Sequence, residues 1–190
     1  FEHYYLLYQR RNLDLWAEYA DGKVTKEELN RQRYLYPLEA VGAGDSTLAK
    51  AYERDALTMI PTKSKLMPHA REVLEYLSGK YNLYILSNGF KELQSHKMRS
   101  SGIDEYFKKV VLSDDIGILK PWPEIFHFAL STTQSELNNS LMIGDSWEND
   151  IVGAAGVGMH QVFYNLSGRT DLPFAPTYQI TDLKDLFNFL

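Results

Sequence analysis

Apolar side chains recur at the spacing of an amphipathic helix through the first sixty residues of the chain. The pattern is interrupted at residues 21–23 and again at residues 42–46, so it predicts three helices joined by short turns. Thr25 and Glu28 have the spacing of a capping box, which predicts that the second helix begins there. We expect Ser46 to cap the third helix.

From about residue 66 the pattern changes to short apolar runs that alternate with helical segments. The runs predict strands, with a short fifth one last, at residues 83–86, 110–112, 141–143, 160–164 and 178–180. The amphipathic segments predict helices at residues 68–77, 90–100, 123–130, 150–157 and 182–189. Because strands that alternate with helices form βαβ units, the sequence predicts an α/β fold: a Rossmann-like parallel sheet with helices on both faces. We expect the domain boundary between residues 62 and 63.

Composition narrows the classes of function. The 190 residues include no cysteine, which excludes disulfides, zinc–thiolate sites and a thiol nucleophile. The net charge is −5, and the nearest approach to a basic run, Gln9-Arg10-Arg11, is too short for a nucleic-acid footprint. No run approaches the ~18 apolar residues of a membrane span, and the N-terminus lacks the features of a signal peptide. We therefore expect a cytoplasmic protein whose partners include neither nucleic acid nor membrane.

Polar residues follow three of the predicted strands, and open parallel sheets bind ligands at the carboxyl ends of strands. Ser87, Asn88 and Gly89 follow the first strand. A hydroxyl beside the free N–H groups of a helix N-terminus favours an anion such as phosphate. The alternative is that Ser87 only caps the following helix, which is the commoner meaning of such a signal taken alone.

A lysine lies in the loop before the helix predicted at residues 123–130. Lys120 stands beside Pro121 and shortly before Pro123, so we expect its loop to be well defined. An ammonium group there would neutralise a phosphate or a developing negative charge. The alternative is a solvated loop lysine, which is again the commoner case for an isolated signal.

Two aspartates follow the third strand within a few residues, at Asp145 and Asp150. Oxygen ligands at a strand end suit Mg²⁺, which takes few carboxylates and completes its shell with water and substrate oxygens. The alternative is that Asp145 or Ser146 caps the next helix. Since a cap requires one acceptor and this loop holds two aspartates, we favour the metal site.

The order of these signals resembles motifs two to four of the haloacid dehalogenase (HAD) superfamily: a hydroxyl, then a lysine before a helix, then Gly-Asp with a second Asp five residues later. The resemblance covers roughly the C-terminal two thirds of the chain. It implies that Ser87 and Asn88 bind the substrate phosphate and that Lys120 steadies both the phosphate and the nucleophile. It also implies that Asp145 ligates Mg²⁺. Asp150 would hold the ligating and phosphate-binding residues in place without contacting the metal itself.

The chain departs from that family in one respect. The family's first motif, Asp-x-Asp-x-Thr, supplies the aspartate that is phosphorylated, and no segment here fits it; the acids at Asp14 and at Asp114-Asp115 lack its spacing and context. Residues 1–62 resemble part of the helical cap that follows this motif in the family. We therefore expect the first strand and its nucleophile to lie upstream of Phe1, in the sheet between the strands that end at Ser87 and Asp145.

The resemblance also narrows the reaction. Metal-free haloacid dehalogenases have Ser-Ser-Asn where this chain has Gly144-Asp145, so we expect a Mg²⁺-dependent phosphatase with a small phosphorylated metabolite as its partner. Residues 87–90 and 117–121, with the segment around Trp16, resemble pyrimidine 5′-nucleotidases that act on nucleoside monophosphates. The alternatives are a sugar-phosphate or phosphoglycolate phosphatase, and a non-catalytic ligand-binding relic.

Several further residues have the chemistry to contact a nucleotide base or sugar, namely Tyr19, Arg31, Arg33, Trp122 and Trp147. For each of these, packing or an exposed helix face is the simpler interpretation, because one aromatic or basic residue near a site is weak evidence for contact with a ligand.

Overall fold

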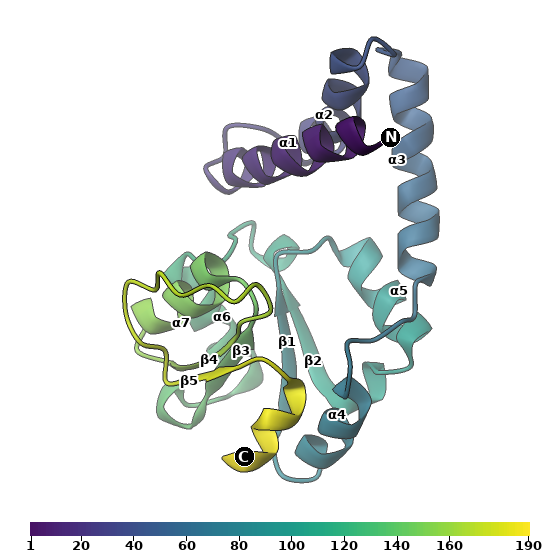
Figure 1. The fold of residues 1–190 in the computed structure, drawn as a ribbon. Coiled ribbons are helices and arrows are strands. Elements are labelled where there is room, and N and C mark those ends of the chain that lie inside the picture. Colours follow the sequence, from purple (N-terminus) through teal and green to yellow (C-terminus); the bar gives the residue numbers. More distant parts are fainter. The chain divides into compact units, whose positions relative to one another are not determined.

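The computed structural model describes residues 1–190, which divide into a helical unit, Phe1–Lys63, and an α/β unit, Ser64–Leu190. Figure 1 shows both units along the course of the chain. None of the helices combines the length and the apolarity that a crossing of the bilayer requires. The interpretation of the helical unit as a cap stays a prediction.

The helical unit contains the three predicted helices, α1 (Glu2–Ala20), α2 (Lys26–Ala40) and α3 (Ser46–Met59), and ends in a 3₁₀ turn at Ile60–Thr62. The capping box is confirmed, since Thr25 Oγ1 accepts from the Glu28 N–H at 3.1 Å and Glu28 Oε2 accepts from the Thr25 N–H at 2.9 Å. The predicted cap of α3 is wrong by one residue.

Asp45 caps α3 in place of Ser46, and its Oδ1 accepts from the Thr47 N–H at 2.7 Å. A carboxylate is both a good acceptor and a favourable charge at the positive end of a helix, so the acid takes this position and the hydroxyl residue that follows becomes the first helical residue.

Leucine and tyrosine side chains hold the helical unit together. Leu15 of α1 and Leu29 of α2 are fully buried where the two helices pack. Tyrosine rings from all three helices form a connected cluster, with centroids 5.6 Å apart for Tyr8 and Tyr34 and 6.4 Å apart for Tyr34 and Tyr52. Burial, together with the neighbouring tyrosines, raises the pKa of Tyr4 to about 12. Burial likewise raises the pKa of Tyr34 to about 12.

The α/β unit alternates strands and helices as predicted. Its strands are β1 (Leu83–Ser87), β2 (Phe107–Leu112), β3 (Leu141–Gly144), β4 (His160–Tyr164) and β5 (Tyr178–Ile180). Its α-helices are α4 (Ala70–Ser78), α5 (Lys91–Ser101), α6 (Pro123–Thr133) and α7 (Gly153–Gly156). Two predicted helices differ in type. A π-helical turn, Trp147–Val152, precedes α7, and the C-terminal helix is a 3₁₀ helix, Leu183–Asn188.

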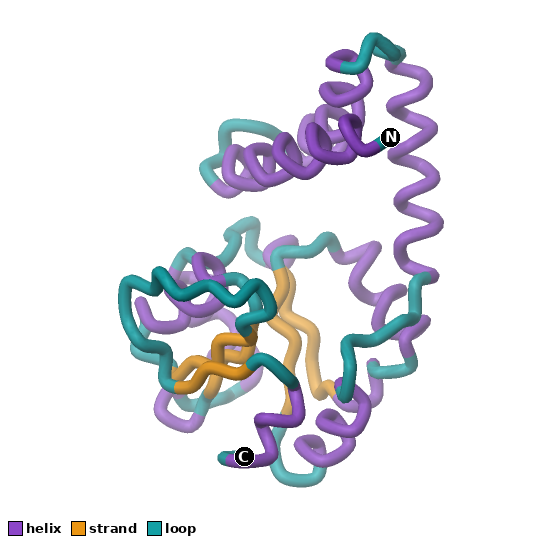
Figure 2. Tube along the Cα trace, viewed as in Figure 1, coloured by secondary structure: helices purple, strands orange, loops and turns teal.

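All strand pairs are parallel, which confirms the predicted α/β class, but the strands form two groups (Figure 2). One group is β1–β2 and the other is β3–β4–β5. Strands β1 and β3 therefore each have an edge that no other strand of the described residues pairs with. The additional strand expected between these two edges stays a prediction.

Helices cover both faces of the β3–β4–β5 group. Alternate residues of β3 pack against different helices. Leu141 and Ile143 pack into one cluster with residues of α4, β4, β5 and the C-terminal 3₁₀ helix. Met142, between them, packs into a second cluster with Ile125 and Phe126 of α6 and with Ala154 of α7. Successive side chains of a strand point to opposite faces, so the two clusters lie on opposite sides of the sheet.

Candidate active site

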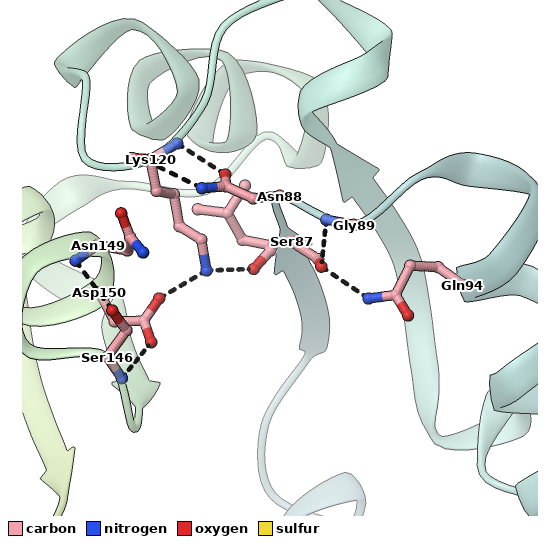
Figure 3. A network of polar contacts seen from close by, with 9 residues as sticks. Ser87, Asn88, Gly89, Gln94, Lys120, Ser146, Asn149 and Asp150 are labelled. Atoms are coloured by element: carbon pink, nitrogen blue, oxygen red, sulfur yellow. Dashed lines mark hydrogen bonds and ion pairs between the residues drawn. The ribbon is translucent and has the colours of Figure 1, made fainter. Parts of the chain in front are cut away.

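Ser87 is the last residue of β1, and its hydroxyl accepts two hydrogen bonds (Figure 3). The Gly89 N–H donates to Ser87 Oγ at 3.0 Å, and Nε2 of Gln94 donates to it at 2.6 Å. The following helix, α5, begins at Lys91 after Phe90 and has no side-chain cap. The alternative in which Ser87 only caps this helix is therefore wrong.

Gln94 is a residue of this network that the sequence analysis missed. It lies in the first turns of α5 and is half-buried. The only signal in the sequence was its distance of seven residues from Ser87. That distance places two side chains together only because the chain turns sharply between the strand and the helix.

Asn88 links two loops. Its Nδ2 donates to the Lys120 carbonyl at 3.0 Å, and its Oδ1 accepts from the Lys120 N–H at 2.7 Å. The oxygen and the nitrogen of the side-chain amide are thus both paired with the backbone of one residue. This pairing ties the residue that follows β1 to the loop that holds Lys120, and the predicted contact of Asn88 with phosphate stays a prediction.

Lys120 is buried, with 8% of its surface exposed, so the alternative of a solvated loop lysine is wrong. Its Nζ donates to the Leu86 carbonyl at 2.8 Å and to Asp150 Oδ1 at 2.6 Å. An ammonium group has three N–H donors, so one of them has no protein partner. The residue holds a positive charge, with one donor to spare, beside the carboxyl end of β1 (Figure 3).

Asp150 is 5% exposed and joins the lysine to the loop that follows β3. Its Oδ2 accepts from the Ser146 N–H at 3.0 Å, while its Oδ1 accepts from Lys120. Gly144 makes this position possible, because a Cβ atom there would lie 2.2 Å from the Asp150 carboxylate. The close approach explains why β3 ends in glycine.

The loop turns into a π-helical segment immediately after Ser146. The Ser146 carbonyl accepts from the Asp150 N–H at 2.9 Å and from the Ile151 N–H at 3.3 Å, and Ser146 Oγ accepts from the Asn149 N–H at 3.2 Å. Single π-helical turns are frequent at functional sites. Ser146 thus caps the π-helical turn, which agrees with the alternative that Asp145 or Ser146 is a helix cap. Asp145 is not needed for this cap.

Asp145 is exposed and makes no hydrogen bond or ion pair within the protein, unlike Asp150. No group of three or more acids or histidines in residues 1–190 is arranged to hold a metal ion by itself. Mg²⁺ requires less than that, since it is commonly bound through one or two carboxylates, water and substrate phosphate. Asp145 fits one such position better than Asp150, because each oxygen of Asp150 already accepts a hydrogen bond.

Trp147 and the aromatic rings around it pack within the α/β unit, next to the loop that follows β3. Trp147 is buried, and its ring centroid lies 5.2 Å from that of Phe163 and 4.9 Å from that of Phe174, which confirms the packing interpretation. Arg169 lies over the Trp147 ring and donates to Glu148 at 2.7 Å. That hydrogen bond lowers the pKa of the Glu148 carboxyl. Trp122 differs, since half of its surface is exposed.

The residues of the helical unit that were considered for substrate contact differ in exposure. Arg31 is exposed, whereas Arg33 is buried and donates to Asn30 Oδ1 at 2.5 Å. Tyr19 is half-buried. An exposed helix face and interior packing account for the two arginines, as the simpler interpretation held.

The chain matches the protein family described as haloacid dehalogenase-like hydrolase over residues 2–158. The crystal structure of the HAD-hydrolase YfnB from Bacillus subtilis, bound to magnesium, superimposes with a TM-score of 0.89 at 28% identity. That superposition covers 98% of this chain and 82% of YfnB.

Relatives with described substrates fall into more than one class. The pyrimidine 5′-nucleotidase YjjG of Escherichia coli is 30% identical over 185 residues, which is 96% of this chain and 80% of YjjG. A glyceraldehyde 3-phosphate phosphatase of Pyrococcus abyssi is 38% identical over 99 residues, which is 52% of this chain and 42% of that enzyme. Both act on phosphate esters, but their substrates are chemically different.

Proposed function

Since the chain belongs to the haloacid dehalogenase-like hydrolases and is a phosphatase of that family, we propose that it is a Mg²⁺-dependent 5′-nucleotidase for pyrimidine nucleoside monophosphates. One observation carries the proposal. Ser87 and the Lys120–Asp150 pair meet at the carboxyl ends of β1 and β3, where a phosphate group would find a hydroxyl and an ammonium together. The extensive similarity to YjjG supports the nucleotide.

Lys120 supplies the positive charge that the reaction requires. Its buried ammonium is balanced by Asp150 and held by the Leu86 carbonyl, so its position is set before substrate arrives. The remaining N–H would donate to a phosphoryl oxygen. Such a preorganised donor stabilises the charge that develops in the transition state, and its effect is larger in a buried site than in water.

Asp145 is the carboxylate that we propose as a Mg²⁺ ligand, because it is the acid of this loop that no protein group engages. When bound there, Mg²⁺ would act as a Lewis acid on the phosphate oxygens. The magnesium bound in the structure of YfnB supports a metal requirement, and the choice of Asp145 rests on its exposed carboxylate.

The proposed reaction requires a nucleophile, and the resemblance to the family implies an aspartate. The phosphoryl group would pass from the substrate oxygen to an aspartate carboxylate with release of the nucleoside, and water would then hydrolyse the acyl phosphate. We propose that this aspartate lies outside the 190 residues, on a strand between the free edges of β1 and β3.

The test is phosphate release by the complete natural polypeptide carrying Asp145→Ala. We expect the Mg²⁺-dependent activity toward uridine and cytidine monophosphates to be lost, because the metal loses its ligand from this loop. Glu105→Ala is the matched control, since Glu105 is an exposed acid of the same unit that lies outside the site. Turnover that is unchanged by Asp145→Ala would contradict the proposal.

A sugar-phosphate phosphatase is the second candidate, and the similarity to the glyceraldehyde 3-phosphate phosphatase favours it. The two candidates share the phosphate-binding residues and differ in what the rest of the site accepts. Comparison of kcat/KM for nucleoside monophosphates and for sugar phosphates separates them. A preference for sugar phosphates would replace the nucleotidase assignment and leave the phosphatase assignment intact.

A further inference from the structure

The hydroxyl of Ser87 is surrounded by donors. A serine oxygen has two lone pairs and one proton, so it can accept two hydrogen bonds and donate one. The Gly89 N–H and the Gln94 amide occupy both accepting positions, at 3.0 and 2.6 Å. The proton of Ser87 is therefore directed away from both of these neighbours.

We propose that Gln94 is a positioning residue that makes the Ser87 hydroxyl a hydrogen-bond donor to the substrate phosphoryl group. This inference rests on the proposed function, in which Ser87 contacts phosphate. A phosphate ester that is ionised offers oxygens that only accept, so a serine hydroxyl binds it well only when its proton points toward it. Without Gln94, one lone pair of the hydroxyl is free and the proton has more than one direction available.

The geometry of the turn favours this role. Gln94 lies on a helix, so its backbone is held by the hydrogen bonds of α5. A Cβ atom at Gly89 would lie 3.0 Å from the carboxamide of Gln94, so the glycine leaves the space in which that side chain reaches Ser87. The turn at Gly89 between β1 and α5 thus brings the neutral amide of Gln94 to the Ser87 hydroxyl (Figure 3).

The neutrality of Gln94 matters for an anionic ligand. A carboxylate in its place would accept the Ser87 proton, which reverses the direction of the hydrogen bond, and would add a negative charge near the phosphate. Gln94→Glu, almost identical in size, is therefore the most informative substitution. Gln94→Leu removes the donor without adding a charge.

The experiment is a double-mutant cycle in the complete natural polypeptide, with inorganic phosphate as the probe and its affinity measured by calorimetry in the presence of Mg²⁺. We expect Gln94→Leu to weaken phosphate binding by about 5- to 10-fold, the size of one hydrogen bond between neutral groups. Gln94→Glu should weaken it further. In the Ser87→Ala background, Gln94→Leu should have no additional effect, because the hydroxyl through which Gln94 acts is absent.

Three outcomes would overturn the inference, and they are distinguishable. Equal losses from Gln94→Leu with and without the Ser87 hydroxyl would mean that Gln94 acts through packing. Wild-type affinity in Gln94→Glu would mean that Ser87 donates to residue 94 and not to phosphate. A wild-type protein that binds no phosphate would instead overturn the proposed function on which the inference rests.

Two further variants serve as a control and as an alternative test. Gln179→Leu, at an exposed glutamine of β5, should leave phosphate affinity unchanged. Gly89→Ala keeps Gln94 but presses on its carboxamide, and we expect it to weaken phosphate binding in the same direction as Gln94→Leu. It provides the measurement if Gln94→Leu does not fold, and wild-type affinity in Gly89→Ala would then contradict the proposal.

Discussion

The two units of this protein treat their buried polar groups differently. In the α/β unit, Lys120 and Asp150 are buried and each makes two hydrogen bonds within the site. In the helical unit, three buried polar atoms have no partner: the Tyr4 hydroxyl, Asn12 Oδ1 and Arg33 Nε. The α/β unit has one such atom, Ser113 Oγ, and it lies outside the network around Lys120.

This difference shows which part of the molecule holds its polar side chains in a defined geometry. A buried polar network whose members are all paired holds its side chains in one arrangement, which is what binding and catalysis require. A buried polar atom without a partner costs about 1–3 kcal/mol, so the helical unit must offset that cost with the packing of its leucines and tyrosines. The two units therefore depend on different interactions, and different substitutions should damage them.

Removal of the Lys120 charge should have the largest effect. Lys120→Met leaves the Asp150 carboxylate buried without its cation, which we expect to lower the free energy of unfolding by about 3–5 kcal/mol. Loss of the donor should also lower kcat by about 10²–10³-fold in the complete polypeptide. Denaturant unfolding and steady-state kinetics measure the two effects.

Lys65→Met is the control for this substitution, because Lys65 is an exposed lysine of the same unit. It should change neither quantity. Normal stability of Lys120→Met would show that the pair contributes less than its burial implies, and the contrast between the units would weaken.

Truncation of a buried leucine in the helical unit should have the second-largest effect. Leu15 is fully buried in the helical unit, so Leu15→Ala should lower the free energy of unfolding by about 2–5 kcal/mol through lost burial and a cavity. We expect inorganic phosphate to bind the folded variant as it binds the wild type, since no residue of the phosphate network lies in the helical unit. Denaturant unfolding and calorimetry report the two quantities, and a matching loss of phosphate affinity would show that the units are coupled.

Substitution of Gly144 should have a smaller effect on stability. The added methyl group of Gly144→Ala would meet the Asp150 carboxylate and displace it, at a cost of about 1–3 kcal/mol. Activity should fall because Lys120 loses the alignment of its partner. Gly156→Ala is the control, since a Cβ atom there meets nothing. Equal activities of the two variants would contradict a positioning role for Asp150.

Alkaline pH should produce the smallest effect, and it should originate in the helical unit. The pKa of Tyr34 is raised from 10.0 to about 12 in the folded protein. Above pH 10 the unfolded chain loses this proton while the folded chain retains it, so the unfolded state becomes favoured and stability falls until about pH 12. The pKa of Tyr4 is also raised to about 12, so this residue lowers stability over the same pH range.

The measurement is the denaturation midpoint of wild type and Tyr34→Phe between pH 8 and pH 11. The variant should lose less stability over that range, because it has one fewer proton to lose on unfolding. Tyr81→Phe, at an exposed tyrosine of the α/β unit, is the control. An identical loss of stability in wild type and Tyr34→Phe would show that the cluster does not govern the alkaline response.

Local patterns of residues were enough to predict the order of elements and the strand ends at which polar residues gather. Apolar periodicity and a capping box depend on residues a few positions apart, and such local patterns can be recognised without the fold. The strands predicted at residues 160–164 and 178–180 therefore agree with the structure at both ends. Ser87, Lys120 and Asp145 were recognised for the same reason, because each follows a strand or precedes a helix in a characteristic order.

The partners and the burial of those residues depend on the fold. Lys120 lies 30 residues from Asp150 and its backbone 32 residues from the Asn88 amide, so their pairing depends on how the strands are arranged and not on any local pattern. Burial then determined that Lys120 is paired and not solvated. The contact of Gln94 with Ser87 likewise required the turn at Gly89. Side chains are selected for such contacts by the space and the partners that the fold supplies, which the order of residues does not encode locally.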